Sequence, residues 1–211
     1  MPVPSYGLEP KRRPLLEQTL MAAIGFGELA SGKIYTAPEL GRRYSATSAQ
    51  VRASLRTLAV DGLVTAVPGR GFYIAEPTTQ ELSELVELRL LIEVPTARKA
   101  AEFGLSDQEC SQTRWLAEAT MTAALQGDLL GYIRSDLDFH LHLVALGGNT
   151  ELVEVIRVLR IRSRIRVSEE MATSFMKRNA EEHLAMAEML AIGDGPGLDD
   201  ILRCHVVRGL E

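Results

Sequence analysis

An aspartate and a histidine lie one helical turn apart in the segment SDLDFHLHLV, residues 135–144. Residues four apart on a helix differ by about 40° in direction, so Asp136 and His140 point the same way and can chelate one ion. His142 is rotated by about 200° from His140 and is expected to face another environment. The pair raises the question of which side chains could complete a metal site.

The chain has four histidines, and the other two lie in separate apolar segments of helical spacing, NAEEHLAMAEML and DDILRCHVVRGL. A single histidine on an apolar face is more often a hydrogen-bonded core residue than a ligand. An aspartate and three histidines on three helices favour a shared cation, because a buried carboxylate without a partner is costly. The predicted ligands are Asp136, His140, His183 and His205.

This ligand set predicts a borderline divalent ion, since it combines imidazole nitrogens with one carboxylate oxygen. Zn²⁺ is the default, and Ni²⁺, Mn²⁺, Co²⁺ or Fe²⁺ are alternatives. Octahedral geometry would leave positions open for a small carboxylate. An open position on Zn²⁺ can also activate water, so a metal-dependent hydrolase is a second hypothesis. The absence of an HExxH-like element weighs against it.

The composition indicates a folded chain. Of 211 residues, 46% are hydrophobic and 24% are charged, as in a globular protein of one domain or two small ones. Cys110 and Cys204 lie far apart without a CxxC motif, which favours reduced thiols in a cytoplasmic protein. No segment reaches the roughly 20 apolar residues of a membrane span, so no membrane partner is expected.

The two parts of the chain differ in charge. Residues 1–76 carry 9 Lys and Arg against 6 Asp and Glu, a net charge of +3, whereas the remainder carries −8. A basic front part could meet a polyanion, while an acidic rear part would be repelled by one.

The front part, 1–76, is predicted to be a winged helix-turn-helix behind a flexible arm at 1–13. Apolar spacing predicts a helix from Pro14 to near Gly32. A capping-box pattern at Thr36 begins a second helix, and SATSAQVRASLRTLAVDGL predicts a third. Two β-prone runs, LVTAV and GFYIA, flank a Pro-Gly-Arg turn and predict the hairpin that forms the wing.

The third helix would enter the major groove with its first residues facing the base edges. Arg52 could bind phosphate or guanine, and Gln50 could pair with adenine. The hydroxyls of Thr47 and Ser48 could bond phosphates. Each residue alone could equally be a solvated surface residue, but the order of helices and hairpin favours double-stranded DNA as the partner.

This front part resembles the DNA-binding domain of GntR-type bacterial transcription regulators. The resemblance rests on AAIGFGELASGKI, PELGRRY, VRASLRTLAVDGLV and PGRGFYI, of which the last two are the most specific. It implies that Arg52 contacts DNA together with Gly69, Arg70 and Gly71 of the wing.

Two arginines frequent in that family are replaced here by Pro38 and Ser48. The replacements imply an unusual operator or a reduced affinity. Arg42, Arg43 and the basic arm could compensate through phosphate contacts, which would make binding strongly salt-dependent.

Beyond a linker at 77–79, residues 80–211 are predicted to be all-helical, because their apolar periodicity shows no strand signal. The expected break between the fourth and fifth helices is at Asn179. The six expected helices are 80–103, 106–126, 128–146, 150–173, 180–192 and 197–209.

Residues 80–209 resemble the FCD ligand-binding domain of the FadR-type branch of these regulators. Its pattern of Asp-x-x-x-His, a later Glu-His and a final histidine is matched by the four predicted ligands, and "FH" and "GGN" also fit. The resemblance implies a homodimer with an organic-acid effector at the metal. Arg89 matches a recurrent arginine that could clamp an effector carboxylate. The alternative for Arg89 is an ion pair with Glu93 or Glu87.

Four arginines alternate along VLRIRSRIRV and would spread around a helix, some facing the pocket and most solvated or paired: Arg160, Arg162, Arg164 and Arg166. The apolar side chains expected in core packing include Trp115, Met121, Met186 and Met189.

The sequence therefore predicts a mainly α, dimeric transcription regulator. Metal-assisted binding of a carboxylate effector would shift the helical domain and change the spacing of two winged helices on a pseudo-palindromic operator. A DNA-binding regulator with a purely structural metal is the remaining hypothesis.

Overall fold

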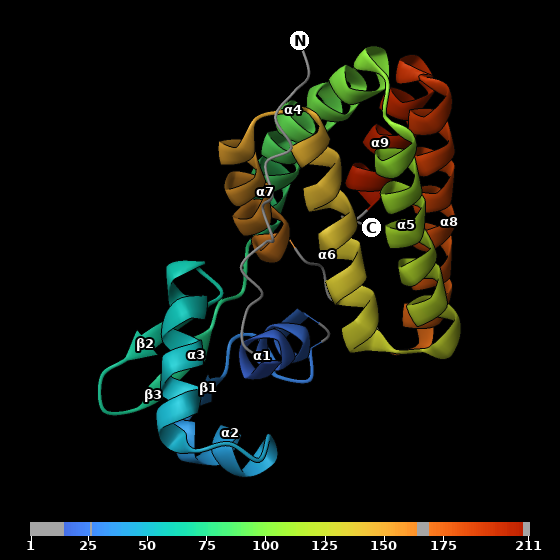
Figure 1. The fold of residues 1–211 in the computed structure, drawn as a ribbon. Coiled ribbons are helices and arrows are strands. Elements are labelled where there is room, and N and C mark those ends of the chain that lie inside the picture. Colours follow the sequence, from blue (N-terminus) through green and yellow to red (C-terminus); the bar gives the residue numbers. More distant parts are fainter. Residues whose placement is uncertain (1–14, 26, 164–168, 209–211) are drawn as a thin grey trace.

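A computed structural model describes residues 15–25, 27–163 and 169–208, and the mainly α fold expected from the sequence is confirmed (Figure 1). The first part of the chain forms α1 (Leu15–Gly25), β1 (Ile34–Tyr35), α2 (Ala37–Arg43), α3 (Ser48–Val60), β2 (Val64–Val67) and β3 (Gly71–Ile74). The second part forms α4 (Thr79–Phe103), α5 (Asp107–Gln126), α6 (Leu129–Leu146), α7 (Thr150–Arg162), α8 (Glu169–Ile192) and α9 (Gly195–Arg208).

The helix-turn-helix is formed by α2 and α3, and each helix begins with a capping box. Thr36 and Glu39 exchange side-chain and backbone hydrogen bonds at the start of α2. Thr47 and Gln50 do the same at the start of α3. Each box satisfies amide groups that have no partner within the helix. Between the helices, Ser45 takes a positive φ of 51°, which makes the turn tight.

The wing is a three-stranded antiparallel sheet in the order β1-β3-β2. The hairpin of β2 and β3 confirms the prediction from LVTAV and GFYIA. Strand β1 was not predicted, because two residues are too few to show a period of two. It pairs Ile34 with Tyr73 and Tyr35 with Phe72.

The first helix is shorter than expected. It ends at Gly25, and Gly27 and Gly32 have positive φ values of 74° and 75°, which a continuing helix does not allow. Apolar spacing alone cannot reveal such an end, since the buried residue Leu29 continues the apolar pattern in a turn.

In the helical part, α5 packs between α6 and α8, and α4 packs along α9 (Figure 1). Buried side chains such as Phe139, Leu143 and Met186 fill the space between these helices. Helix α1 packs against both α3 and α6, so one apolar core continues from the winged helix into the helical part. None of the described helices is long and apolar enough to cross a membrane.

The expected boundary between the fourth and fifth helices of this part was wrong. α7 ends at Arg162, and α8 runs without interruption through Asn179. Asn179 is buried inside α8, and neighbours with high helix propensity outweigh its weak tendency to end a helix. Two of the alternating arginines, Arg164 and Arg166, lie outside the described residues.

Trp115 was also predicted wrongly, because 64% of its surface is exposed on α5. Met186 is fully buried, while Met121 and Met189 are partly buried against the core. On a helix that packs between two others, one face still remains open to solvent, and Trp115 lies on that face.

The exposure of Trp115 leads to a stability prediction. Trp115→Ser is expected to change the free energy of unfolding by less than about 0.5 kcal/mol, as surface substitutions do. Leu143→Ala, at a side chain 2% exposed, is expected to cost about 2–5 kcal/mol because it leaves a cavity. Urea unfolding of both variants checks the contrast; equal losses would show that Trp115 is covered.

Candidate metal centre and DNA-binding surface

The four predicted ligands converge from three helices. Asp136 and His140 come from α6, His183 from α8 and His205 from α9. The Nε2 atom of His140 lies 3.1 Å from Nε2 of His183 and 3.1 Å from Nε2 of His205. Oδ1 of Asp136 lies 3.7 Å from Nε2 of His183.

These separations can be compared with a coordination shell. Ligand atoms about 2.1 Å from an ion lie about 3.0 Å apart at a 90° angle and about 3.4 Å apart at the tetrahedral angle. The two 3.1 Å separations are closer to the octahedral value. All four ligand atoms lie within 4.8 Å of one another. Two ligand atoms on opposite sides of an ion would be about 4.2 Å apart, so the four side chains would need to move only slightly closer together to bind one.

Burial keeps two of the histidines neutral. It lowers the pKa of His140 to about 3 and lowers that of His183 well below its ordinary value. Both side chains are fully buried, and desolvation disfavours the charged imidazolium. Neutral imidazole is the form that binds a metal ion.

Carboxylates face the outer nitrogens of two of the histidines. Nδ1 of His140 lies 2.8 Å from Oε2 of Glu93, and Nδ1 of His205 lies 2.7 Å from Oε2 of Glu182. A carboxylate at Nδ1 favours the tautomer with hydrogen on that nitrogen, which leaves the Nε2 lone pair free for a ligand bond. The imidazole of His183 instead stacks on Phe139, with ring centroids 4.3 Å apart.

Two arginines and two carboxylates form a buried network beside the histidines. Glu93 pairs with Arg89 at 2.7 Å and with Arg160 at 3.0 Å. Arg160 also binds Oδ2 of Asp136 at 3.0 Å. Burial alone would raise the pKa of Glu93, but Arg89 and Arg160 hold it well below its usual range. Asp136 thus gives one oxygen to Arg160 and turns the other toward the histidines.

The ion pair of Arg89 with Glu93 is one of the two alternatives that the sequence left open for this arginine. Arg89 is 6% exposed, and it also donates to the hydroxyl of Ser163 at the end of α7. The contacts of Glu93 with His140 and Arg160, and of Glu182 with His205, were not predicted, because spacing along one helix cannot show which residue of another helix a side chain meets. The Glu-His dipeptide at 182–183 was the one available signal.

His142 lies apart from the cluster, as expected from its direction on α6. Its Nε2 is 2.9 Å from the hydroxyl of Thr113 on α5. Burial lowers the pKa of His142 to about 4. His142 therefore serves as a matched control for the cluster histidines.

The predicted DNA-contacting residues lie at the exposed start of α3 and at the wing. Thr47 is the N-cap residue of α3. The backbone amide and the hydroxyl of Thr47 both donate hydrogen bonds to Oε1 of Gln50. Gln50 would have to leave this capping box before its carbonyl could accept from adenine. Ser48 is the first residue of α3 and is half-buried, and Pro38 lies in the first turn of α2, where a proline is well tolerated.

Arg52 is exposed on α3, and Arg56 lies one turn further on the same face. Arg56 was missed although its i+4 spacing was visible in the sequence. Arg42 is exposed, whereas Arg43 pairs with Glu28 at 2.8 Å and is less available for phosphate. The basic arm lies outside the described residues.

At the wing, Arg70 and Gly69 are exposed at the turn. A Cβ atom on Gly69 would meet open space, but one on Gly71 would collide with the carbonyl oxygen of Tyr35. Gly71 is thus required by the close approach of β1, whatever its contact with DNA.

The model of the FCD domain matches residues 84–208, which is more than half of the chain and contains all four clustered residues. This chain is a GntR-family regulator of the FCD branch. The sequence resemblance is thereby confirmed.

Two curated proteins that are similar to this chain are transcriptional regulators. The Nta operon transcriptional regulator of Aminobacter aminovorans is 28% identical over 155 residues, covering 72% of this chain and 71% of that protein. The HTH-type transcriptional regulator BphR of Paraburkholderia xenovorans (strain LB400) is 25% identical over 205 residues, covering 92% and 83%. Since the relatives are regulators and not enzymes, the metal-dependent hydrolase hypothesis is set aside.

Solved structures share the fold of this GntR-family chain. E. coli McbR/YncC has a TM-score of 0.73 at 20% identity and covers 92% of each chain. A putative GntR regulator from Rhodococcus sp. RHA1 has a TM-score of 0.70 at 20% identity and covers 92% of this chain and 93% of its own. At this identity the likeness concerns the fold alone.

Proposed function

We propose that this FCD-branch regulator binds double-stranded operator DNA through its winged helix and a divalent metal ion, Zn²⁺ by default, through Asp136, His140, His183 and His205. The observation that carries the metal proposal is the direction of the imidazoles. With hydrogen on Nδ1 of His140 and His205, facing Glu93 and Glu182, the Nε2 lone pairs point toward one another at 3.1 Å. A cation between them would turn this repulsion into attraction.

The charges around the cluster favour an anionic effector. Arg89 and Arg160 balance Glu93 and Asp136, so these four charged groups together carry no net charge. A divalent ion would add two positive charges in a poorly solvated site, which is costly without an anion. A carboxylate that binds the metal would offset that cost. Arg89 remains our candidate for contacting it, and it would have to exchange part of its pairing with Glu93.

Octahedral geometry would leave two coordination positions beyond the four protein ligands. Two adjacent oxygens of one small molecule could fill both, so we propose a hydroxycarboxylate or dicarboxylate that chelates the metal. When bound, the metal supplies a Lewis-acidic centre that attracts these oxygens. The protein residues orient the ligands: Arg160 holds Asp136, and the two glutamates hold the imidazoles.

A thermal-shift screen tests the effector proposal. We expect hydroxycarboxylates and dicarboxylates to raise the melting temperature of the Zn²⁺-loaded protein but not of the chelator-treated protein. A monocarboxylate of similar size without a second oxygen-bearing group should give a smaller shift, because it cannot chelate the metal through two separate groups. Equal shifts with and without metal would contradict effector binding at the metal.

The alternative of a purely structural metal predicts a different outcome. In that case no carboxylate would change operator affinity in a gel-shift experiment at fixed salt, although the metal would still stabilise the fold. An effector that acts on DNA binding must prefer one arrangement of the two winged helices in a homodimer. A change in affinity that depends on metal would support the sensor.

The exposed arginines of α3 give a prediction about DNA binding. Arg52→Ala is expected to cost about 1–3 kcal/mol of operator affinity and to relax specificity at one base pair. Arg56→Ala is expected to weaken binding to all sequences and to reduce the salt slope by about one. Fluorescence anisotropy with an operator selected from a random duplex pool measures both.

Arg114→Ala is the control for these variants, because this exposed arginine lies on α5 in the helical part. It should leave operator affinity unchanged. If Arg52→Ala bound the selected operator as tightly as the wild type, α3 would not be the recognition helix.

A further inference from the structure

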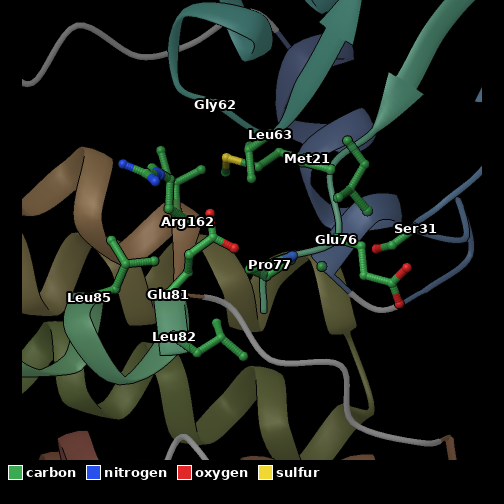
Figure 2. Close-up of a pocket in the computed structure, with 14 residues that line it drawn as sticks. Met21, Ser31, Gly62, Leu63, Glu76, Pro77, Glu81, Leu82, Leu85 and Arg162 are labelled. Atoms are coloured by element: carbon green, nitrogen blue, oxygen red, sulfur yellow. The ribbon is translucent and has the colours of Figure 1, made fainter. Parts of the chain in front are cut away.

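A cavity lies where the winged helix meets the helical part, and its volume is about 300 Å³. Its walls come from α1, the residues after α3, the connection from β3 to α4, the start of α4 and the end of α7 (Figure 2). It is separate from the metal cluster, because none of its lining residues belongs to the cluster or its carboxylate partners.

The cavity has an apolar floor and a polar rim. Met21 and Ile24 of α1, Leu63 after α3 and Leu85 of α4 are buried side chains of the floor. At the rim, Ser31 and Glu76 lie on one side, and Glu81 and Arg162 lie on the other (Figure 2).

The charged groups of the rim include both signs, because Glu76 and Glu81 are carboxylates and Arg162 is a cation. Oε2 of Glu81 accepts hydrogen bonds from the amide and hydroxyl of Thr78. These hydrogen bonds lower the pKa of Glu81, and the positive charge of Arg162 lowers it further. The guanidinium of Arg162 lies over Gly62, and its Nε atom would be 3.4 Å from a Cβ atom placed on that glycine. A ligand therefore needs no net charge to fit this rim.

We infer that this cavity is a second ligand site, which takes a small, neutral and largely apolar molecule such as an aromatic compound with one hydrogen-bonding group. Its volume equals the lower end of the range for small-molecule pockets and is too small for a peptide helix. The floor provides apolar contact, the hydroxyl of Ser31 can donate or accept one hydrogen bond, and the rim carboxylates can accept one.

The position of the cavity gives such a ligand an effect on DNA binding. It would contact α1 and Leu63 in the winged-helix part together with Leu82 and Ile161 in the helical part. A ligand that touches both parts favours the arrangement in which its walls are closest. Gly62 and Leu63 directly follow Asp61, the C-terminal cap of α3, so movement of the recognition helix would change the cavity.

Methyl NMR of the full chain, labelled with ¹³C-methyl methionine and titrated with indole, tests the inference. The Met21 methyl group lines the cavity, whereas Met186 is buried in the helical part. We expect the Met21 resonance to shift and saturate with a dissociation constant of about 1 mM, while Met186 stays in place. Chelator-treated and Zn²⁺-loaded protein should both respond.

Two variants fill the cavity. Leu82→Trp and Ala75→Leu, which introduces a smaller side chain than tryptophan, are each expected to weaken indole binding about tenfold. Leu88 lies on an exposed face of α4, the helix that also carries Leu82. Leu88→Trp is therefore the matched control and should bind indole as the wild type does. The inference is overturned if Met21 does not shift, if all methionines shift alike, or if both filled variants bind indole as the wild type does. The result does not bear on the metal proposal, because none of these variants changes a proposed metal ligand.

Discussion

Replacing Glu93 with leucine is expected to lower the free energy of unfolding of the metal-free protein by about 3–5 kcal/mol. Glu93 is 2% exposed, and it is the shared partner of Arg89 and Arg160, which are 6% and 7% exposed. Its removal leaves two buried guanidinium groups with too few acceptors. The loss of stability arises because two buried positive charges are left without a negative partner, and not because one ion pair is lost.

Urea unfolding measures this loss, and Glu102→Leu is the matched control. Glu102 also lies on α4 and also pairs with an arginine four residues away, but both side chains are about half exposed. An exposed pair of this kind contributes about 0–1 kcal/mol. A loss of equal size in the two variants would show that the network around Glu93 is solvated and that our charge argument for the effector is wrong.

His183→Ala is expected to abolish most of the stabilisation that Zn²⁺ gives to the protein. A ligand at 100 times its dissociation constant stabilises the folded state by about 2.7 kcal/mol, which the wild type should show as a rise in melting temperature. His183 is fully buried between Phe139 and the other two imidazoles, so the remaining ligands cannot replace its nitrogen. The variant should bind Zn²⁺ more weakly by orders of magnitude.

His142→Ala separates a loss of metal from a loss of packing. This histidine lies on α6 beside His140 but contacts Thr113. The variant should lose some stability and keep the full rise in melting temperature with Zn²⁺. A lost rise in His142→Ala, or an unchanged one in His183→Ala, would speak against the proposed ligand set.

The convergence of the four predicted ligands could be inferred from the sequence, because helical periodicity indicates which side chains share a face of a helix. Asp136 and His140 share a face at i+4 spacing, and His142 does not. The later histidines each lie in an apolar helical segment, so burial brought them toward the same interior. The capping box predicted at Thr36 is confirmed, whereas the similar box at Thr47 was not predicted although Thr47 and Gln50 have the same spacing.

Features that depend on contacts between elements could not be predicted. The partners of Glu93 come from α4, α6 and α7, and nothing in the local sequence relates it to Arg160. Trp115 was placed in the core on residue type alone, although the packing of α5 leaves it exposed. Asn179 was taken as a break because asparagine occurs at helix ends, whereas neighbours with high helix propensity continue α8 through it.

Zinc-edge X-ray absorption of the stoichiometrically loaded protein tests the central proposal most directly, because it counts the imidazoles bound to the ion. We predict one tightly held Zn²⁺ per chain with three imidazole nitrogens at about 2.0–2.1 Å and at least one oxygen. His183→Ala should retain at most two imidazoles. A wild-type protein that holds no Zn²⁺, or holds it with fewer than three imidazoles, would contradict a metal centre formed by these three helices.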